Sequence, residues 1–149
     1  MKRTHIILYI LLTTLLCSAC SREDDVDEIF PGKTWYMSGI VVNGITSSQE
    51  TAQFYQEDNT YYISFSSGTF KGVLSSGVNI SGTYTADGKH QSISFTLDAP
   101  SSSLSQFDLQ IYNRLKGMTA YSSGADWLHL GDANGNRILF ARSRNQIIN

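Results

Sequence analysis

The residues of this chain best suited to chemistry are two cysteines, Cys17 and Cys20, in a C-x-x-C arrangement. Such a pair performs thiol exchange in a βαβ setting, or supplies half of a four-ligand zinc site. No cysteine follows Cys20, so the rest of the chain offers neither further thiolate ligands nor a disulfide framework. The residues that precede the pair therefore decide between redox chemistry, metal binding and covalent processing.

Those residues have the three parts of an export signal. Lys2 and Arg3 carry positive charge, residues 6–16 are mostly aliphatic, and Ser18-Ala19 supplies small residues at a cleavage site. A spanning helix needs about 20 apolar residues, more than this run offers. We therefore expect residues 1–19 to be a signal peptide rather than a membrane-spanning helix.

The stretch Cys17-Ser18-Ala19-Cys20 resembles the lipobox of bacterial lipoproteins, with Cys17 where an aliphatic residue is usual. The resemblance implies cleavage before Cys20, acylation of its thiol and new amino group, and a membrane partner through that lipid. Two or three acyl chains anchor a protein stably, whereas one chain is marginal.

Five acidic residues follow the expected anchor within eight positions. By composition, residues 20–29 are a solvated tether, because a run of like charge buries nothing and repels itself. The run also resembles the surface-export signal of Bacteroidetes lipoproteins, which implies a place on the outer face of the outer membrane. The expected export-signal residues are Glu23, Asp24, Asp25, Asp27 and Glu28.

Beyond the tether the chain is close to electrically neutral. Removal of residues 1–19 leaves 130 residues with 9 basic and 13 acidic side chains, a net charge of −4. Without residues 21–28 the counts are 8 and 8, so nucleic acid is not an expected partner. Residues 30–143 form one domain of ordinary size, followed by a tail over 144–149.

The sequence pattern of this domain is typical of β-strands. Apolar and polar residues alternate with period 2 in several runs, which places each apolar set on one face of a strand. Gly39 and Gly72 indicate bulges or close packing, and the pairs Asp87-Gly88 and Asn134-Gly135 predict tight hairpins. Residues 132–136 are better interpreted as a hairpin than as a calcium loop, because they lack the full spacing and the closing glutamate of such a loop. The expected strands are 35–42, 60–65, 68–75, 78–86, 90–97, 127–131 and 137–142.

One segment has helical spacing instead. Leu104, Phe107, Ile111, Leu115 and Met118 recur at steps of three and four, which predicts a helix over about 103–116 with its apolar stripe on the sheet. Serines at 101–103 can cap its start and Gly117 can end it; a shorter helical turn is expected within 45–58. The predicted class is mainly β: an antiparallel sheet or partly closed barrel of about eight strands, with one helix packed on it.

The order of these elements resembles a known family. Residues 115–142, "LKGMTAYSSGADWLHLGDANGNRILFAR", are similar to the end of the META domain of HslJ-like lipoproteins. Residues 77–89 and 30–40 are similar to its G-C-N-x-x-x-G-x-Y and L-x-G-x-x-W segments, although Val78 replaces the cysteine. A Bacteroidetes family of small lipoproteins of unknown function fits equally well. The resemblance implies a fold, and an envelope-stability or stress role facing the periplasm as one alternative.

No residue is expected to be catalytic and no cofactor or metal is predicted. His90 lies beside a predicted turn and His129 on the face opposite Leu128 and Leu130; two histidines on separate hairpins make a weak case for a general base. The carboxylates are scattered along the domain, and no nucleophile elbow, phosphate loop or H-E-x-x-H helix occurs. A small hydrolase remains an alternative, which a close Asp/Glu or His pair in a pocket would favour.

Aromatic residues suggest binding instead. Tyr36 and Tyr62 fall on the strand faces opposite Trp35 and Ile63, so both rings are candidates for exposure. Exposed rings on a sheet stack on sugars or dock a partner. The leading hypothesis is a non-catalytic surface lipoprotein that binds a glycan, a peptide or a partner protein through these rings.

Overall fold

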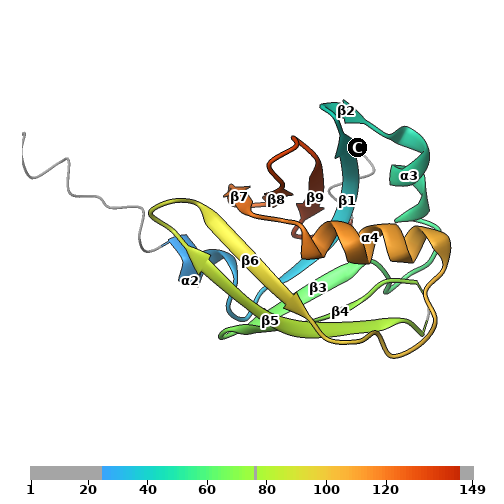
Figure 1. Cartoon of the computed structure of the whole chain (residues 1–149), viewed down its shortest axis with the longest axis horizontal. Coiled ribbons are helices and arrows are strands. Elements are labelled where there is room, and N and C mark those ends of the chain that lie inside the picture. Colours follow the sequence, from blue (N-terminus) through green and yellow to red (C-terminus); the bar gives the residue numbers. More distant parts are fainter. Residues whose placement is uncertain (1–24, 76, 145–149) are drawn as a thin grey trace, which may run out of the picture.

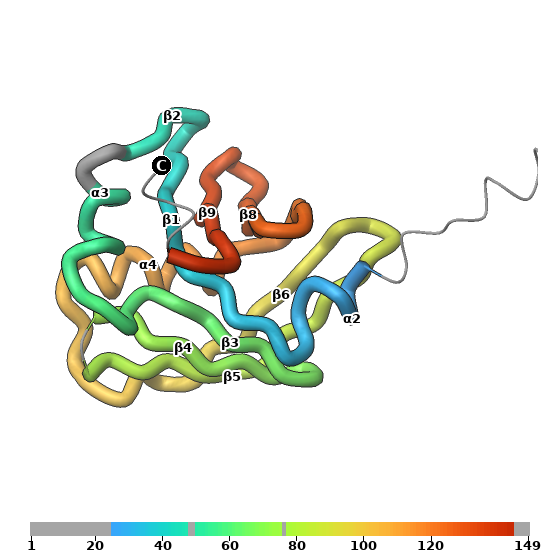
Figure 2. The backbone as a smooth tube through the Cα atoms, turned by 180° about the vertical axis from the view of Figure 1, so that it is seen from behind, coloured from blue at the N-terminus to red at the C-terminus, as the bar shows by residue number. Residues whose placement is uncertain are grey.

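The computed structural model describes residues 25–75 and 77–144, which form a closed antiparallel barrel of eight strands with one additional strand (Figures 1 and 2). The predicted fold class is confirmed. The expected signal peptide, Cys20, Glu23, Asp24 and the residues beyond Arg144 lie outside the described residues.

The elements follow one another in this order: α2 (Asp25–Ile29), β1 (Thr34–Val42), β2 (Ile45–Thr46), α3 (Ser48–Gln53), β3 (Tyr62–Ser66), β4 (Thr69–Val73), β5 (Asn79–Asp87), β6 (Ser92–Leu97), α4 (Gln106–Lys116), β7 (Ala120–Ser123), β8 (Trp127–Gly131) and β9 (Arg137–Ala141). No helix in the described part of the chain is long and apolar enough to cross a membrane.

The strand order is β2-β1-β3-β4-β5-β6-β7-β8-β9, and an antiparallel pairing of β1 with β9 closes the barrel. Strand β1 therefore pairs on one side with β3 and on the other with β9. The register of β1 against β9 shifts between Met37 and Gly39, which indicates a β-bulge. Gly39 is one of the two glycines expected to mark a bulge or close packing. A Cβ on Gly39 would lie 3.2 Å from the Leu139 Cδ1 atom, so side-chain packing is close there.

The period-2 alternation determines what fills the barrel. Inward residues of each strand are buried while their neighbours face solvent, as in β5, where Ile80, Gly82 and Tyr84 are buried and Asn79 and Thr83 are exposed. Aromatic rings dominate the interior, with Phe65 edge-to-face against Tyr84 at 5.0 Å between ring centroids. Burial of these apolar side chains is the main stabilising term of the fold.

Helix α4 runs back along β6 and lies across the side of the barrel where β6 and β7 separate (Figure 1). These two strands pair at a single position, Ser92 with Ala120. The fully buried Ile111 and Leu115 of α4 complete the core. The helix ends at Gly117 as predicted, but the expected cap at 101–103 is wrong: Ser105 caps the start by accepting a hydrogen bond from the Asp108 N–H.

Helix α2 lies inside the segment that composition assigned to a tether. Its last residue, Ile29, and the following Phe30 are buried, and the Phe30 ring packs edge-to-face on Tyr121 at 5.1 Å. The indole N–H of Trp35 donates to the Ile29 carbonyl at 2.8 Å. The apolar Ile29-Phe30 pair thus draws the preceding acidic residues into a helical turn at one end of the barrel.

The predicted hairpins are present, with one difference. Asp87 pairs with Ser92, so the β5–β6 loop has four residues, and positive φ falls on Gln91 rather than on Asp87 or Gly88. The Asp87 carboxylate instead accepts from the Lys89 N–H at 2.9 Å, which stabilises a longer loop. Gly135 has φ of 80°, as expected between β8 and β9. The helical turn expected within 45–58 is α3, which ends at Phe54.

Candidate binding surface

The two tyrosines expected to bind a ligand are direct neighbours. Tyr36 of β1 lies opposite Tyr62 of β3 in the ladder, and their half-buried rings are 5.9 Å apart between centroids, tilted by 52°. Both face outward because Trp35 and Ile63, their neighbours in sequence, fill the barrel. Cross-strand aromatic pairs of this kind hold the two rings in a fixed relative position.

The pair belongs to a longer row across four strands. Tyr36 also lies opposite Ala141 of β9, and Ala141 lies opposite Trp127 of β8. Trp127 is 42% exposed, one of the three most exposed large apolar side chains in the described part of the chain. We call the set Tyr62, Tyr36, Ala141 and Trp127 the aromatic row; its small member, Ala141, leaves space between the rings on either side.

Two hollows lie along the aromatic row. One, of about 430 Å³, is lined by Trp127, His129, Ala141, Asp126, Leu139 and Ser38. The other, of about 450 Å³, lies between Tyr36 and the chain segment that leaves β9, with Asp58, Asn59 and residues 142–144 around it. The row thus combines one exposed ring, Trp127, and two half-buried rings with open space and nearby polar groups, as binding surfaces do.

Charged and polar groups surround the rings. The Arg144 guanidinium lies 5.8 Å from the Tyr36 ring centroid and donates to the carbonyls of Glu57 and Thr60. At the other end, the His129 ring packs 4.5 Å from the Trp127 ring. Burial lowers the pKa of His129 from its ordinary value of 6.5, and the positive charge of Arg137 lowers it further. His129 is therefore neutral at pH 7, able both to donate and to accept a hydrogen bond.

A third hollow, of about 540 Å³, adjoins the Tyr62 end of the row. It lies over the outer face of β3, β4 and β5 and includes Lys71, Asn79 and the loop that contains Ser101. We call it the Lys71 hollow. Gly72 is buried beneath it, and a Cβ at Gly72 would lie 2.6 Å from the Tyr62 carbonyl oxygen. The strands therefore approach closely at Gly72, the second glycine expected to mark a bulge or close packing.

A fourth hollow, of about 740 Å³, lies beside α2 at the end of the chain nearest the expected anchor. Three of the expected export-signal residues, Asp25, Asp27 and Glu28, line it together with Lys33 and Arg142. Arg142 also lies over the buried Trp35 ring, at 4.9 Å. Charges of both signs meet there, and Arg142 also lines the hollow beside Tyr36, so this charged end adjoins the aromatic row.

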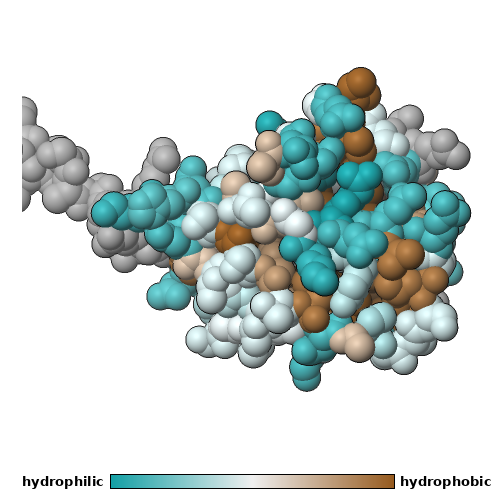
Figure 3. Space-filling model, in the orientation of Figure 1, coloured by the Kyte–Doolittle hydropathy of each residue, from teal (hydrophilic) through white to brown (hydrophobic). Residues whose placement is uncertain are grey.

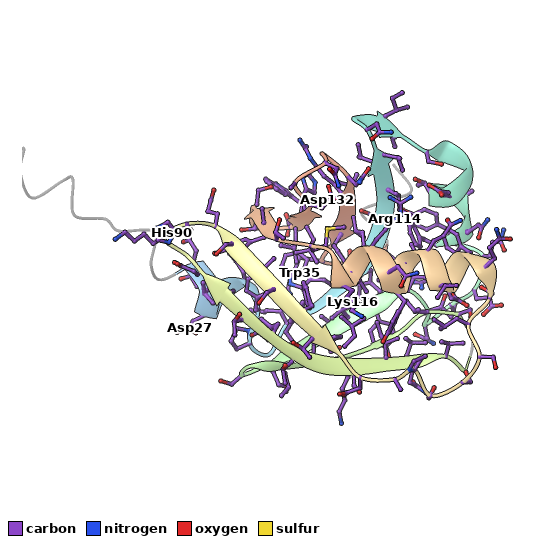
Figure 4. The ribbon with its side chains drawn as sticks, in the orientation of Figure 1. Asp27, Trp35, His90, Arg114, Lys116 and Asp132 are labelled. Atoms are coloured by element: carbon purple, nitrogen blue, oxygen red, sulfur yellow. The ribbon has the colours of Figure 1, made fainter. Side chains whose placement is uncertain are left out.

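The histidines do not form a joint site. His90 is at the tip of the β5–β6 hairpin, away from Arg114 and Lys116 of α4 (Figure 4), whereas His129 faces outward from β8 as its alternation predicted. The Nδ1 atom of His90 lies 2.5 Å from the Asp87 carboxylate, whose pKa is lowered by that hydrogen bond, but both side chains are well exposed. Within residues 25–75 and 77–144, no three potential metal ligands come together.

Sequence reasoning missed one buried polar cluster. The fully buried Asp108 carboxyl accepts hydrogen bonds from the Tyr61 hydroxyl at 3.1 Å, the Ser75 hydroxyl at 2.6 Å and the Ser105 hydroxyl at 2.8 Å. Burial raises the pKa of Tyr61 above its ordinary value of 10.0, and Asp108 raises it further. Asp108 lies next to Phe107 of the predicted apolar stripe, so helical spacing alone could have indicated that it faces inward.

The family model described as Domain of unknown function (DUF4847) matches residues 21–142. The chain belongs to the DUF4847 family. The expected membership of the META/HslJ-like family is therefore wrong. The glycines, aromatics and turn residues that carried the resemblance are common to antiparallel sheets, and the cysteines that would have distinguished META domains are absent.

Solved structures show the same fold. A DUF4847 family protein from Bacteroides vulgatus ATCC 8482 is similar with a TM-score of 0.66 and 22% identity, over 80% of this chain and 98% of that chain. A protein from Burkholderia xenovorans is similar with a TM-score of 0.56 and 17% identity, over 80% of this chain and 88% of that chain. A third protein has a TM-score of 0.53 and 18% identity, over 82% and 97%. No curated protein matches the chain.

Proposed function

We propose that this DUF4847 protein is a non-catalytic lipoprotein that binds a glycan chain on the aromatic row. The observation that supports the proposal is the row itself: three outward rings on β3, β1 and β8, held in register by cross-strand pairing. The sheet positions them before a ligand arrives, so little side-chain ordering opposes binding. Sugar rings offer the flat apolar faces that stack on such aromatic side chains.

The face that carries α4 offers a control. Its surface mixes hydrophilic, intermediate and hydrophobic residues (Figure 3), and Leu109 of α4 is 46% exposed. In Figure 2, seen from behind, β1, β3 and β9 stand in front of α4, so the aromatic row and the helix lie on different sides of the barrel. Leu109→Ala is thus a matched control for loss of exposed apolar area away from the row.

The two tryptophans provide the assay, because Trp35 is 2% exposed and Trp127 is 42% exposed. A glycan on the row should change the fluorescence of Trp127 and leave Trp35 unaffected. Tyr36→Ala should weaken glycan binding about tenfold, as loss of a stacked ring of about 1.4 kcal/mol implies, and Leu109→Ala should leave binding unchanged. Equal binding by both variants, over a panel of neutral and acidic polysaccharides, would contradict the proposal; binding of extended peptides alone would favour a peptide ligand.

The proposed address is the outer membrane, with acylated Cys20 as anchor and the domain on the cell surface. Helix α2 starts at Asp25, five residues after Cys20, and five residues span at most about 18 Å. The domain is thus held close to the membrane, with the acids of α2 within reach of a sorting factor that recognises the lipid. The anchor itself is tested by Cys20→Ser, which should prevent lipid attachment and release the protein from the membrane fraction.

The structure divides the acidic run into two groups for a sharper test of export. Glu23→Ser with Asp24→Asn changes only residues ahead of α2, whereas Asp25→Asn, Asp27→Asn and Glu28→Gln change the helix. The combined variant carries all five substitutions. If the whole run is an export signal, antibody labelling of intact cells should fall for the combined variant while its fold and lipid are retained. Undiminished surface labelling of the combined variant would leave the run as a spacer, which needs only length and solvation.

A further inference from the structure

We infer that the Lys71 hollow is a subsite for an acidic sugar unit, so that the glycan on the aromatic row carries carboxylate or sulfate groups. The inference rests on the proposed function and adds the chemical class of the ligand. It follows from which polar groups of the hollow are already bonded, from the charge of its lining, and from its continuity with the row.

The hydroxyl groups of the hollow are mostly engaged. The Ser81 hydroxyl donates to the Asp98 carboxylate at 2.7 Å, and the Ser101 hydroxyl accepts from the Asn79 N–H at 2.9 Å. Among the described residues, by contrast, the Lys71 ammonium, the Asn79 side-chain amide and the Tyr62 hydroxyl have no protein partner. The free groups all donate hydrogen bonds, and a carboxylate or sulfate accepts several at once.

The charge of the lining is positive. Lys71 is the one Lys, Arg, Asp or Glu among the described residues that line this hollow. Beyond the tether the domain has equal numbers of basic and acidic side chains, and the Asp98 carboxylate accepts a hydrogen bond from the Ser81 hydroxyl of the lining. The Lys71 ammonium is thus the group of the hollow that attracts an anionic ligand.

The hollow continues directly into the aromatic row through Tyr62, which belongs to both. From Lys71 on β4 to Trp127 on β8 the outer face crosses the strands in the order β4, β3, β1, β9 and β8. Four strand spacings of about 4.8 Å make about 19 Å. That length accommodates a chain of several sugar units, with an acidic unit at Lys71 and ring stacking along the rest.

The test compares acidic probes with neutral partners that share the same backbone. Oligogalacturonate is paired with its methyl ester, and dextran sulfate with dextran, each titrated against the mature protein by calorimetry and by Trp127 fluorescence. The acidic member should bind about fivefold more tightly than its partner, the factor expected for one exposed ion pair. This preference should vanish at high salt, where exposed charges are screened. Preference for one acidic probe alone identifies the acidic group as carboxylate or sulfate.

Lys71→Met keeps most of the side-chain stem and removes the charge. It should reduce the affinity for the acidic probe to that for the neutral probe without changing the latter, and Lys116→Met on α4 should change neither. Equal binding of acidic and neutral probes, weakened about tenfold by Tyr36→Ala, would overturn the acidic subsite and leave the proposed function standing. An acidic preference that persists in Lys71→Met would also overturn it, and failure of all four probes to bind would overturn both.

Discussion

Replacement of Asp108, a fully buried residue, by alanine should destabilise the domain. The carboxyl group is fully buried on α4 and accepts hydrogen bonds from Tyr61, Ser75 and Ser105. The alanine side chain cannot accept any of them. The loss of unfolding free energy in Asp108→Ala therefore measures how strongly these hydrogen bonds attach the first turn of α4 to the rest of the barrel.

The magnitude follows from which partners can find replacements. Ser105 is exposed and Ser75 is partly exposed, so water can satisfy both hydroxyls. Tyr61 is 7% exposed, and an unsatisfied buried hydroxyl costs about 1–3 kcal/mol. Loss of an acidic group from the first helical turn adds about 0.3–1 kcal/mol. We expect Asp108→Ala to lower the free energy of unfolding by about 2–4 kcal/mol, and Asp108→Asn, which keeps one acceptor oxygen, by less.

Urea denaturation of the mature protein measures this free energy, and Tyr61→Phe completes a double-mutant cycle. If the Tyr61–Asp108 hydrogen bond carries much of the effect, the two substitutions together should cost about 1–2 kcal/mol less than the sum of the two alone. Additive effects within about 0.5 kcal/mol, or an Asp108→Ala variant as stable as wild type, would refute the reasoning.

Four further predictions concern the core and the titration of two side chains. Ile111→Asp should cost more than about 3 kcal/mol, because it places an unpartnered carboxylate under α4; an unchanged denaturation midpoint would place α4 off the core. Gly72→Ala should cost about 1–3 kcal/mol, because its Cβ would lie 2.6 Å from the Tyr62 carbonyl oxygen, and should weaken glycan binding; wild-type stability would contradict that close approach. Because the pKa of Tyr61 is raised in the folded protein, its contribution to the free energy of unfolding should be fully present below pH 10.0 and decline above it, and the decline should be less steep in Tyr61→Phe. Because the pKa of His129 is lowered, the free energy of unfolding should decline as the pH falls below 6.5, and His129→Asn should lack this contribution.

Strand positions and the inward face of each strand were predictable because they depend on local alternation. Leu128 and Leu130 are buried and His129 faces outward, as period 2 requires. The end of α4 at Gly117 was predictable for the same reason. Its start was not, because serines precede it at 101–103 and at 105, and a cap depends on which hydroxyl reaches a free backbone N–H.

The start of the domain shows where composition misleads. Five acidic residues in eight positions indicate a solvated segment, and nothing local predicts a helix over Asp25–Ile29. The decisive residue is Phe30, which packs against Phe65, Tyr84 and Tyr121 from three separate strands. Only the assembled barrel offers that cavity, so only the tertiary structure places Asp25–Ile29 in a helix.

The sequence by itself determined that Tyr36 and Tyr62 face outward, because each alternates with a residue of the core. It did not determine that they touch, or that Trp127 and Ala141 continue the row. Those neighbours depend on pairing β1 with β3 on one side and with the last strand, β9, on the other. Side-chain direction follows from the backbone period of a single strand, whereas strand neighbours follow from burying the whole apolar set in one closed barrel, which no local stretch encodes.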